Sequence, residues 1–351
     1  MIDRIFLCLL IFVPVTAAAH YLQFSPLLTF FVSGLSIVPL AKFIGEATDE
    51  LAVHTGAGLG GILNATFGNA TELIIGIFAL RAGLLEVVRA SITGSIIGNL
   101  LLVSGMAIFF GGLKFKKQEF NRTASMAGAS TLFLSVIALI IPAIFLQTAP
   151  GIDGGVIEKL SIIVSILMMA VYLASLLFAL KTHAHLYTEE VGKFEEKSKW
   201  SVRKSVFVLL LATLAVAWMS EILVGSIEPL VASFGWTQLF IGVIFIAIIG
   251  NAAEHTSAIV MALKNKMDLA LQISIGSATQ IAMLVMPALI LISSMFKNQL
   301  NLIFNTFELV VILLSVMIIN LVIADGETNW FEGLQLMIAY AIIAAAFFFH
   351  P

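Results

Sequence analysis

Charged residues and cysteines are scarce in this sequence of 351 residues. Only 11% of its residues are charged, against about a quarter in soluble proteins. The formal net charge of −3 gives no reason to expect a nucleic-acid partner. The single cysteine, Cys8, excludes an internal disulfide and a cysteine metal cluster. The composition therefore points away from a soluble or disulfide-stabilised protein.

Apolar residues make up 60% of the chain and are gathered in long runs. A membrane-spanning helix needs about 20 such residues. We therefore predict an all-α polytopic membrane protein, embedded in the lipid bilayer, with about eleven transmembrane helices. The predicted spans are 4–21, 25–43, 58–80, 91–113, 124–147, 157–180, 204–225, 237–263, 269–295, 303–324 and 332–349.

The first span has a second interpretation. Arg4, the apolar stretch 5–15 and the small residues 17–19 resemble a secretory signal peptide with its cleavage site. We expect a retained helix, and cleavage would leave ten spans in the same orientation. If the loops alternate in side, fourteen of the 18 lysines and arginines fall on one side, which predicts that this side is cytoplasmic. The N-terminus is then cytoplasmic, the C-terminus outside, and the short loops favour a prokaryotic plasma membrane.

Two polar stretches interrupt the apolar sequence, GNATE at 68–72 and GNAAE at 250–254. Each places an amide and a carboxylate three residues apart, on one face of a helix. A carboxylate within a membrane span is costly and indicates a functional site. A lone glutamate or asparagine could equally join helices, but the repetition of the whole pattern favours function.

The two stretches belong to an internal repeat. Glu72 and Glu254 are 182 residues apart (254 − 72), and the same offset maps Gly94-Ser95 onto Gly276-Ser277. Five spans separate equivalent helices, so the copies cross the membrane in opposite directions, as in inverted-repeat transporters. The predicted organisation is an N-terminal helix 1–24, a first five-helix repeat 25–181, a charged cytoplasmic linker 182–203 and a second, inverted repeat 204–351.

The linker, a run of glycines and a group of acidic residues each have two interpretations. We interpret the linker as a solvated helix with charge pairs four residues apart. The alternative is a regulatory cation site, although the segment lacks the ligand spacing of a calcium loop. A run of glycines at 56–61 serves a hinge or close helix packing. Acidic residues at the predicted membrane surface, among them Glu46 and Glu50, are solvated or concentrate cations.

The motifs offer the oxygen ligands that calcium and other hard cations prefer. Carboxylates come from the two glutamates, amide oxygens from the two asparagines and closely approaching carbonyls from the two glycines. The expected cation ligands are therefore Glu72, Glu254, Asn69, Asn251, Gly68 and Gly250. Nearby polar residues that either surround the site or pack helices are Ser95, Asn99, Ser277, Gln280 and His255.

Charge balance suggests how such a site works. Two carboxylates neutralise one divalent cation, or they hold two protons. An empty site would leave two negative charges in low dielectric, so it is the least favourable state to move across a membrane. Calcium and protons therefore compete for Glu72 and Glu254, and exchange follows from charge alone.

At these motifs the sequence resembles the calcium/proton antiporter (CAX) family of the cation/calcium exchanger superfamily. The resemblance rests on GNATELI at 68–74, GNAAEHTSAI at 250–259 and the two Gly-Ser pairs. It implies ten core helices in two inverted halves, preceded here by an extra helix. It also implies that Glu72 and Glu254 are shared calcium and proton sites, and that the third and eighth spans are broken near the motifs.

The prediction is a secondary active antiporter, not an enzyme, that exports Ca²⁺ from the cytoplasm in exchange for H⁺ by alternating access. No cofactor is expected, because Ca²⁺ and H⁺ are the transported ions, and the sequence leaves a homo-oligomer open. A sodium-coupled calcium exchanger is the close alternative, although its second motif commonly carries an aspartate where this chain has Glu254. A cation channel is a further alternative that would not need an inverted repeat.

Overall fold

Almost every element of the protein is helical. The computed structural model describes residues 2–149, 151–184 and 198–350. Before the linker the helices are α1 (Ile2–Leu9), α2 (Phe12–Tyr21), α3 (Pro26–Phe67), α4 (Ala70–Arg81), α5 (Leu85–Ile97), the π-helix η1 (Gly98–Val103), α6 (Ser104–Phe115), α7 (Arg122–Thr148), α8 (Gly154–Leu177) and the π-helix η2 (Phe178–Thr182).

The second half continues in the same way. Its helices are α10 (Val202–Gly225), α11 (Ile227–Phe234), α12 (Gln238–Phe240), the π-helix η4 (Ile241–Ile246), α13 (Ala247–Gly250), α14 (Ala252–Leu263), α15 (Met267–Gln280), the π-helix η5 (Ile281–Val285), α16 (Met286–Ser293), α17 (Thr306–Val322) and α18 (Trp330–Phe349). In the described part of the chain the strands are β1 (Gln118–Glu119) and β2 (Glu327–Thr328).

The predicted all-α membrane class is confirmed, but the count of eleven spans is not. Among the described residues, eight helices are long and apolar enough to cross a membrane, or nine if the bent pair formed by 238–250 and 252–263 is one span. The remaining two predicted spans fall short for identifiable reasons. The third is divided between the end of α3 and the 12-residue α4, and α17 has only 17 residues.

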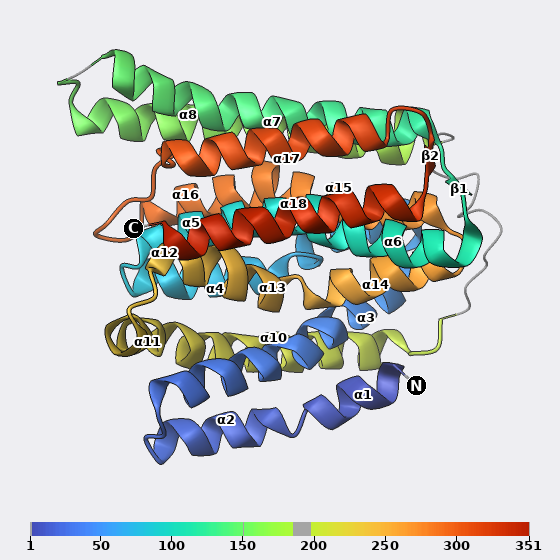
Figure 1. The fold of residues 1–351 in the computed structure, drawn as a ribbon. Helices are drawn as coiled ribbons and strands as arrows, with labels where there is room; N and C mark the ends of the chain where they lie inside the picture. The colour runs from blue at the N-terminus through green and yellow to red at the C-terminus, as the bar shows by residue number, and fades with distance from the viewer. Residues whose placement is uncertain (1, 150, 185–197, 351) are drawn as a thin grey trace. The chain divides into compact units, whose positions relative to one another are not determined.

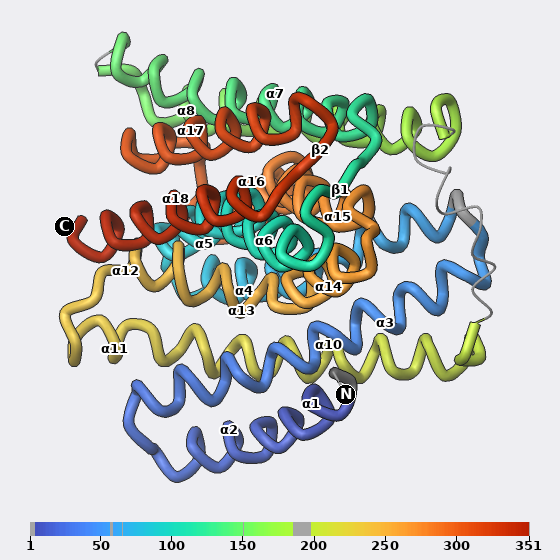
Figure 2. Tube along the Cα trace, turned by 45° about the vertical axis from the view of Figure 1, so that its right-hand side comes forward, coloured from blue at the N-terminus to red at the C-terminus, as the bar shows by residue number. Residues whose placement is uncertain are grey.

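The chain forms two compact units, each containing segments from before and after the linker. The first unit takes residues up to 91 together with 178–253, and the second takes 92–177 together with 254–350. In the first unit α3 and α10 lie side by side, and α4 packs against α10 (Figures 1 and 2). These two units differ from the predicted repeats 25–181 and 204–351. The repeat boundaries therefore remain a prediction.

Helix α3 continues through a region where hydropathy predicted a loop, residues 44–57. The polar residues there are compatible with a helix, and Lys42 forms an ion pair of 3.1 Å with Glu46 one turn later. The helix is kinked at Gly56, whose φ of 78° and ψ of 170° suit glycine. Gly61 instead provides close packing, because a β-carbon there would lie 2.7 Å from Leu180. Close packing is thus observed at Gly61, whereas the kink at Gly56 leaves the hinge a prediction.

In the second unit, α6 packs along α18, α7 contacts α15 and α17, and α8 contacts α16. Strands β1 and β2 pair antiparallel, with Gln118 opposite Thr328. Lys117 forms ion pairs with Glu119 and Glu327, which raise the pKa of Lys117. The Asn121 amide donates to Asp268. These contacts join the predicted loops 114–123, 264–268 and 325–331. The three loops, which are predicted on the same side of the membrane, therefore meet at one end of this unit.

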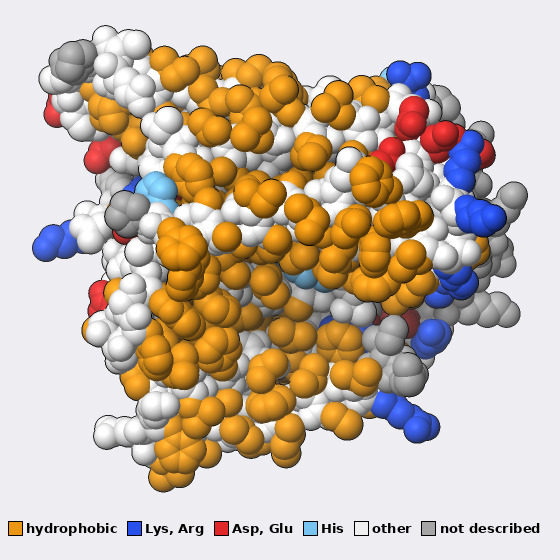
Figure 3. All heavy atoms as spheres, viewed as in Figure 1, with side chains coloured by type: hydrophobic (Ala, Val, Ile, Leu, Met, Phe, Trp, Pro, Cys, Tyr) orange, Lys and Arg blue, Asp and Glu red, His pale blue; other side chains and the backbone are white. Residues whose placement is uncertain are grey.

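The outward faces of several second-unit helices are apolar. Figure 3 shows hydrophobic side chains covering the visible faces of α7, α17 and α18. Among the large exposed residues are Phe133 on α7, Leu314 on α17 and Ile342 on α18. Exposed apolar surface of this extent is costly in water and suits contact with lipid chains. The polypeptide is built for a bilayer.

Most of the charged linker, residues 185–197, lies outside the described residues, and with it the predicted solvated helix. The exit of the linker is held by α3. One carboxylate oxygen of Glu50 accepts hydrogen bonds from the Ser198 hydroxyl and the Lys199 amide, both at 2.8 Å, and from the Trp200 amide at 3.0 Å. His54 Nε2 lies 2.8 Å from the Trp200 carbonyl oxygen. Glu50 therefore anchors the chain as it enters α10.

Candidate functional site

The first motif lies at a break between two helices. Helix α3 ends at Phe67, and Asn69 has φ −106° and ψ 29°, outside the helical region. Helix α4 then begins at Ala70, so Glu72 lies in its first turn. Asn69 is buried, and Glu72 is half-buried. The amide and the carboxylate therefore do not share one continuous helix face, because the helix restarts between them.

The second motif repeats this geometry. Helix α13 ends at Gly250, Asn251 has φ −92° and ψ 12°, and α14 begins at Ala252. The two helices are bent by 58° across this break. Glu254 occupies the first turn of α14, as Glu72 does in α4. The predicted breaks in the third and eighth spans are confirmed.

The local sequence at each break resembles that of a helix start. Asparagine followed three residues later by glutamate is the signature of a helix N-terminus. At α17 it forms a complete capping box, in which Asn305 Oδ1 accepts from the Glu308 amide at 2.8 Å and Glu308 accepts from the Asn305 amide at 3.1 Å. The Asn69 side chain makes no such cap at α4. The first motif thus uses a helix-start sequence without its usual capping bond.

Within the first unit, the first motif touches the second. A β-carbon built on Gly250 would lie 3.1 Å from both Cγ and Oε1 of Glu72. Contacts this short force a neighbour to move, so the absence of a side chain at Gly250 makes room for the carboxylate. Gly68 lies at the break before Asn69, in the same unit. Two residues that are far apart in sequence but belong to equivalent motifs are therefore in contact.

The Asn251 side chain is oriented by its own helix. Its Nδ2 donates to the Ala247 carbonyl oxygen at 2.9 Å, and the Asn251 backbone amide donates to the same carbonyl at 3.1 Å. The amide oxygen of Asn251 is on the other branch of the same planar group. Asn251 is 1% exposed, so this orientation is fixed inside the protein.

In the second unit the structure brings together two of the surrounding polar residues. Asn99, in η1, donates from Nδ2 to the Ser277 hydroxyl on α15 at 3.1 Å. Ser95 is buried on α5, while Gln280 is half-buried at the end of α15. Glu254 and His255 are both half-buried on α14. Asn99 and Ser277 therefore form a polar connection between the two repeats.

Sequence reasoning missed Ser104. Its hydroxyl lies 2.8 Å from that of Ser274 on α15, and it also donates to the Asn99 carbonyl oxygen at 3.1 Å. The sequence contained no signal for this contact, because residues five apart do not share a face of a regular α-helix. Only the π-helical turn η1 brings Ser104 next to Asn99.

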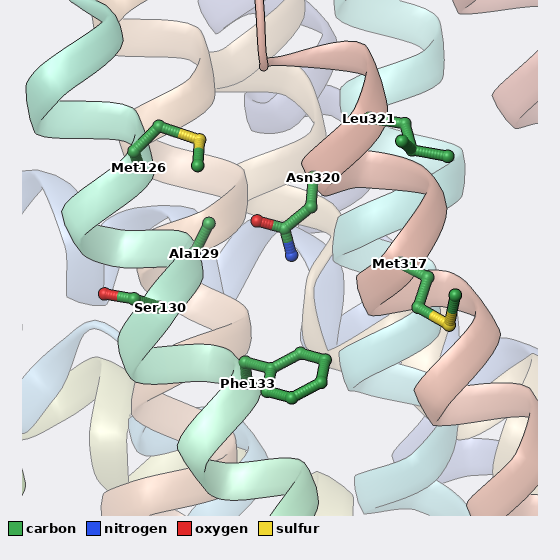
Figure 4. Close-up of a pocket in the computed structure, with 7 residues that line it drawn as sticks. All are labelled: Met126, Ala129, Ser130, Phe133, Met317, Asn320 and Leu321. Carbon is green, nitrogen blue, oxygen red and sulfur yellow. The ribbon is translucent and has the colours of Figure 1, made fainter.

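A separate hollow lies between α7 and α17 of the second unit. Figure 4 shows Met126, Phe133 and Met317 among its mostly apolar lining. Asn320 is its amide-bearing residue, and its Nδ2 donates to the Val316 carbonyl of its own helix at 2.7 Å. None of the predicted site residues lines this hollow, so it is distinct from the candidate site.

Comparison with known proteins identifies the family of this chain. The family model described as sodium/calcium exchanger protein matches residues 25–181 and 204–349. The chain belongs to this family. Members of the sodium/calcium exchanger protein family are membrane transporters, so the helical breaks at Asn69 and Asn251 lie in a transporter fold.

Relatives within this family match nearly the whole chain. The chain is 47% identical to a Ca²⁺/H⁺ antiporter from Synechocystis sp., covering 99% of this chain and 98% of the relative. It is 44% identical to the Ca²⁺/H⁺ antiporter ChaA of Bacillus subtilis, covering 96% of each. The solved structure of native YfkE has 41% identity and a TM-score of 0.86, covering 98% of this chain and 100% of that one.

Proposed function

We propose that this protein exports Ca²⁺ from the cytoplasm in exchange for H⁺. The observation that carries the proposal is the contact between the two motifs in the first unit, where the Glu72 side chain lies against Gly250. A carboxylate at a broken membrane helix, beside a second break with a matching motif, suits a cation site. Relatives at 47% and 44% identity are named Ca²⁺/H⁺ antiporters, which supports the same pair of ions here.

In this proposal Glu72 and Glu254 bind the cation with their carboxylates. Each lies in the first turn of a helix that starts within a span, where the partial positive charge of the helix N-terminus favours an ionised carboxylate. Asn251 contributes its amide oxygen, because its nitrogen is engaged with Ala247. Oxygen ligands of these kinds match calcium better than softer metals.

Coupling follows from charge balance. One Ca²⁺ neutralises two carboxylates, and so do two protons, whereas the empty ionised pair leaves two like charges in low dielectric. The transporter with calcium or protons bound therefore changes between its inward-open and outward-open states more readily than the empty transporter. Competition for the same oxygens then makes calcium leave when protons arrive, which is antiport.

Sodium coupling is the second candidate, because the matching family model is named for sodium/calcium exchange. Purified protein in vesicles separates the two. With sodium and potassium absent from both sides, an imposed calcium gradient should acidify the compartment that calcium leaves. Calcium flux that requires sodium would contradict proton coupling, and flux of calcium alone without counter-movement of protons would indicate a channel.

A further inference from the structure

Two π-helical turns occupy equivalent positions in the two repeats. The turn η1 covers Gly98–Val103, and η5 covers Ile281–Val285. The offset of 182 residues between Glu72 and Glu254 maps η1 onto 280–285, so the turns coincide to within one residue. Both lie in the second unit. Single π-turns inside α-helices are uncommon and are frequently found at functional sites.

The first π-turn is closed by both the backbone and the side chain of Ser104. The Ser104 amide donates to the carbonyl oxygen of Asn99, five residues earlier, which is the bond that defines a π-turn. The Ser104 hydroxyl lies 3.1 Å from the same carbonyl oxygen and shares its single proton between this carbonyl and Ser274 Oγ. Both Ser104 and Asn99 have no solvent exposure. The Asn99 carbonyl is thus held twice by one residue.

This turn connects to α15 at two points. The Ser104 and Ser274 hydroxyl oxygens are 2.8 Å apart, and Asn99 Nδ2 donates to Ser277 Oγ at 3.1 Å. Ser274 and Ser277 are three residues apart and share one face of α15. Asn99 and Ser104 are five apart, and they reach the same helix because the π-turn stacks one over the other. The widened turn is therefore required for both contacts.

We propose that Ser104 is a positioning residue for the cation site: by closing η1 and contacting Ser274, it holds the Asn99 amide on the Ser277 hydroxyl. This inference rests on the proposed function, because Ser277 belongs to the Gly-Ser pair that accompanies the second motif. The second repeat has no serine hydroxyl at the equivalent position. Position 286, equivalent to 104, is Met286, whose amide makes the π-bond to Ile281 without a side-chain hydroxyl.

The test compares Ser104→Ala with a matched serine that bonds only within its own helix. Ser315 on α17 is buried in the same unit, and its hydroxyl donates to the Val311 carbonyl at 2.7 Å. We expect Ser104→Ala to raise the KM for calcium about fivefold, the equivalent of one lost hydrogen bond, with little change in maximal rate. Ser315→Ala should leave the KM unchanged.

Two further measurements separate positioning from general destabilisation. In Ser104→Ala, amide hydrogen exchange should accelerate in the peptide covering 98–104 while exchange in α17 stays as in the wild type. Ser274→Ala should raise the KM in the same direction, and the double variant should be no worse than Ser104→Ala alone, because Ser104→Ala already removes the contact with Ser274.

A wild-type KM in Ser104→Ala, alongside normal wild-type exchange, would overturn the positioning role alone. Equal effects of Ser104→Ala and Ser315→Ala would overturn it too. Failure of the wild-type protein to exchange calcium for protons would instead overturn the proposed function, and the hydrogen-exchange comparison would still report whether Ser104 holds the π-turn.

Discussion

The carboxylate of Glu72 occupies space that a side chain at Gly250 would need, with Oε1 only 3.1 Å from where that β-carbon would be. This contact joins the first motif to the second across 178 residues of sequence (250 − 72). A glycine is therefore required at this position by its neighbour, not by its backbone angles. The sequence pattern showed two glycines in matching motifs, and the structure gives one of them a physical role.

Replacing the motif carboxylates should abolish exchange without unfolding the protein. Glu72→Gln and Glu254→Gln are nearly isosteric, but each leaves a divalent cation with one uncompensated charge. That costs several kcal/mol in low dielectric, and even ~3 kcal/mol lowers binding more than a hundredfold. Vesicle flux and thermal unfolding measure both effects. Glu228→Gln, on the exposed surface of α11, is the control. Near wild-type exchange by either motif variant would show that these residues are wrongly chosen.

Gly250→Ala should weaken calcium binding through Glu72. The added methyl group must displace the carboxylate, and overpacking of this kind costs about 1–3 kcal/mol. We expect a KM for calcium raised about tenfold, equivalent to ~1.4 kcal/mol. The matched control is Gly225→Ala, because a β-carbon there meets no atom within 4 Å. Equal KM values for the two variants would mean that Glu72 does not need the space.

Lowering the pH on the side from which calcium binds should raise the KM for calcium without changing the maximal rate, because protons there compete for the same oxygens; the pH of the opposite side, which supplies the exchanged protons, is held constant. Initial rates measured over a range of calcium concentrations at several pH values check this. A pH effect confined to the maximal rate would indicate that protons act somewhere other than the cation site.

Glu50→Ala should release the exit of the linker from α3. The substitution removes the acceptor of the hydrogen bonds from Ser198, Lys199 and Trp200. Limited trypsin digestion should then cleave after Lys199 faster than in the wild type. Glu46→Ala serves as the control, because Glu46 pairs with Lys42 on the same helix. Equal digestion of both variants would show that the Glu50 contacts do not hold this segment.

Long apolar runs in the sequence predicted much of the fold. The apolar runs located nine of the eleven predicted spans, counting the bent pair, since burial in a bilayer imposes length and composition. The family resemblance predicted the helix breaks, and the Asn-x-x-Glu spacing is typical of a helix start, although Asn69 makes no capping bond at α4. Hydropathy failed at 44–57 because a helix can carry polar residues such as Lys42 and Glu46 where it leaves the apolar layer.

The contacts inside the candidate site were harder to foresee. Asn99 was identified as a polar residue near the site, but its partner Ser277 depends on which face η1 presents. A π-turn has no composition of its own, so Ser104 looked like an isolated serine. The approach of Glu72 to Gly250 depends on tertiary packing between α4 and α13, which no local pattern encodes.

The division of the chain into two units has a consequence for its synthesis. Each unit is built from one segment before the linker and one after it. When the ribosome has finished α8, both units still lack about half of their residues, and neither can complete its core. The helices before the linker pack on one another, as α2 does on α3 and α7 on α8, but both units are completed only after the second repeat is inserted. A chain cut at the linker should yield two fragments that become protease-resistant only when they are produced together.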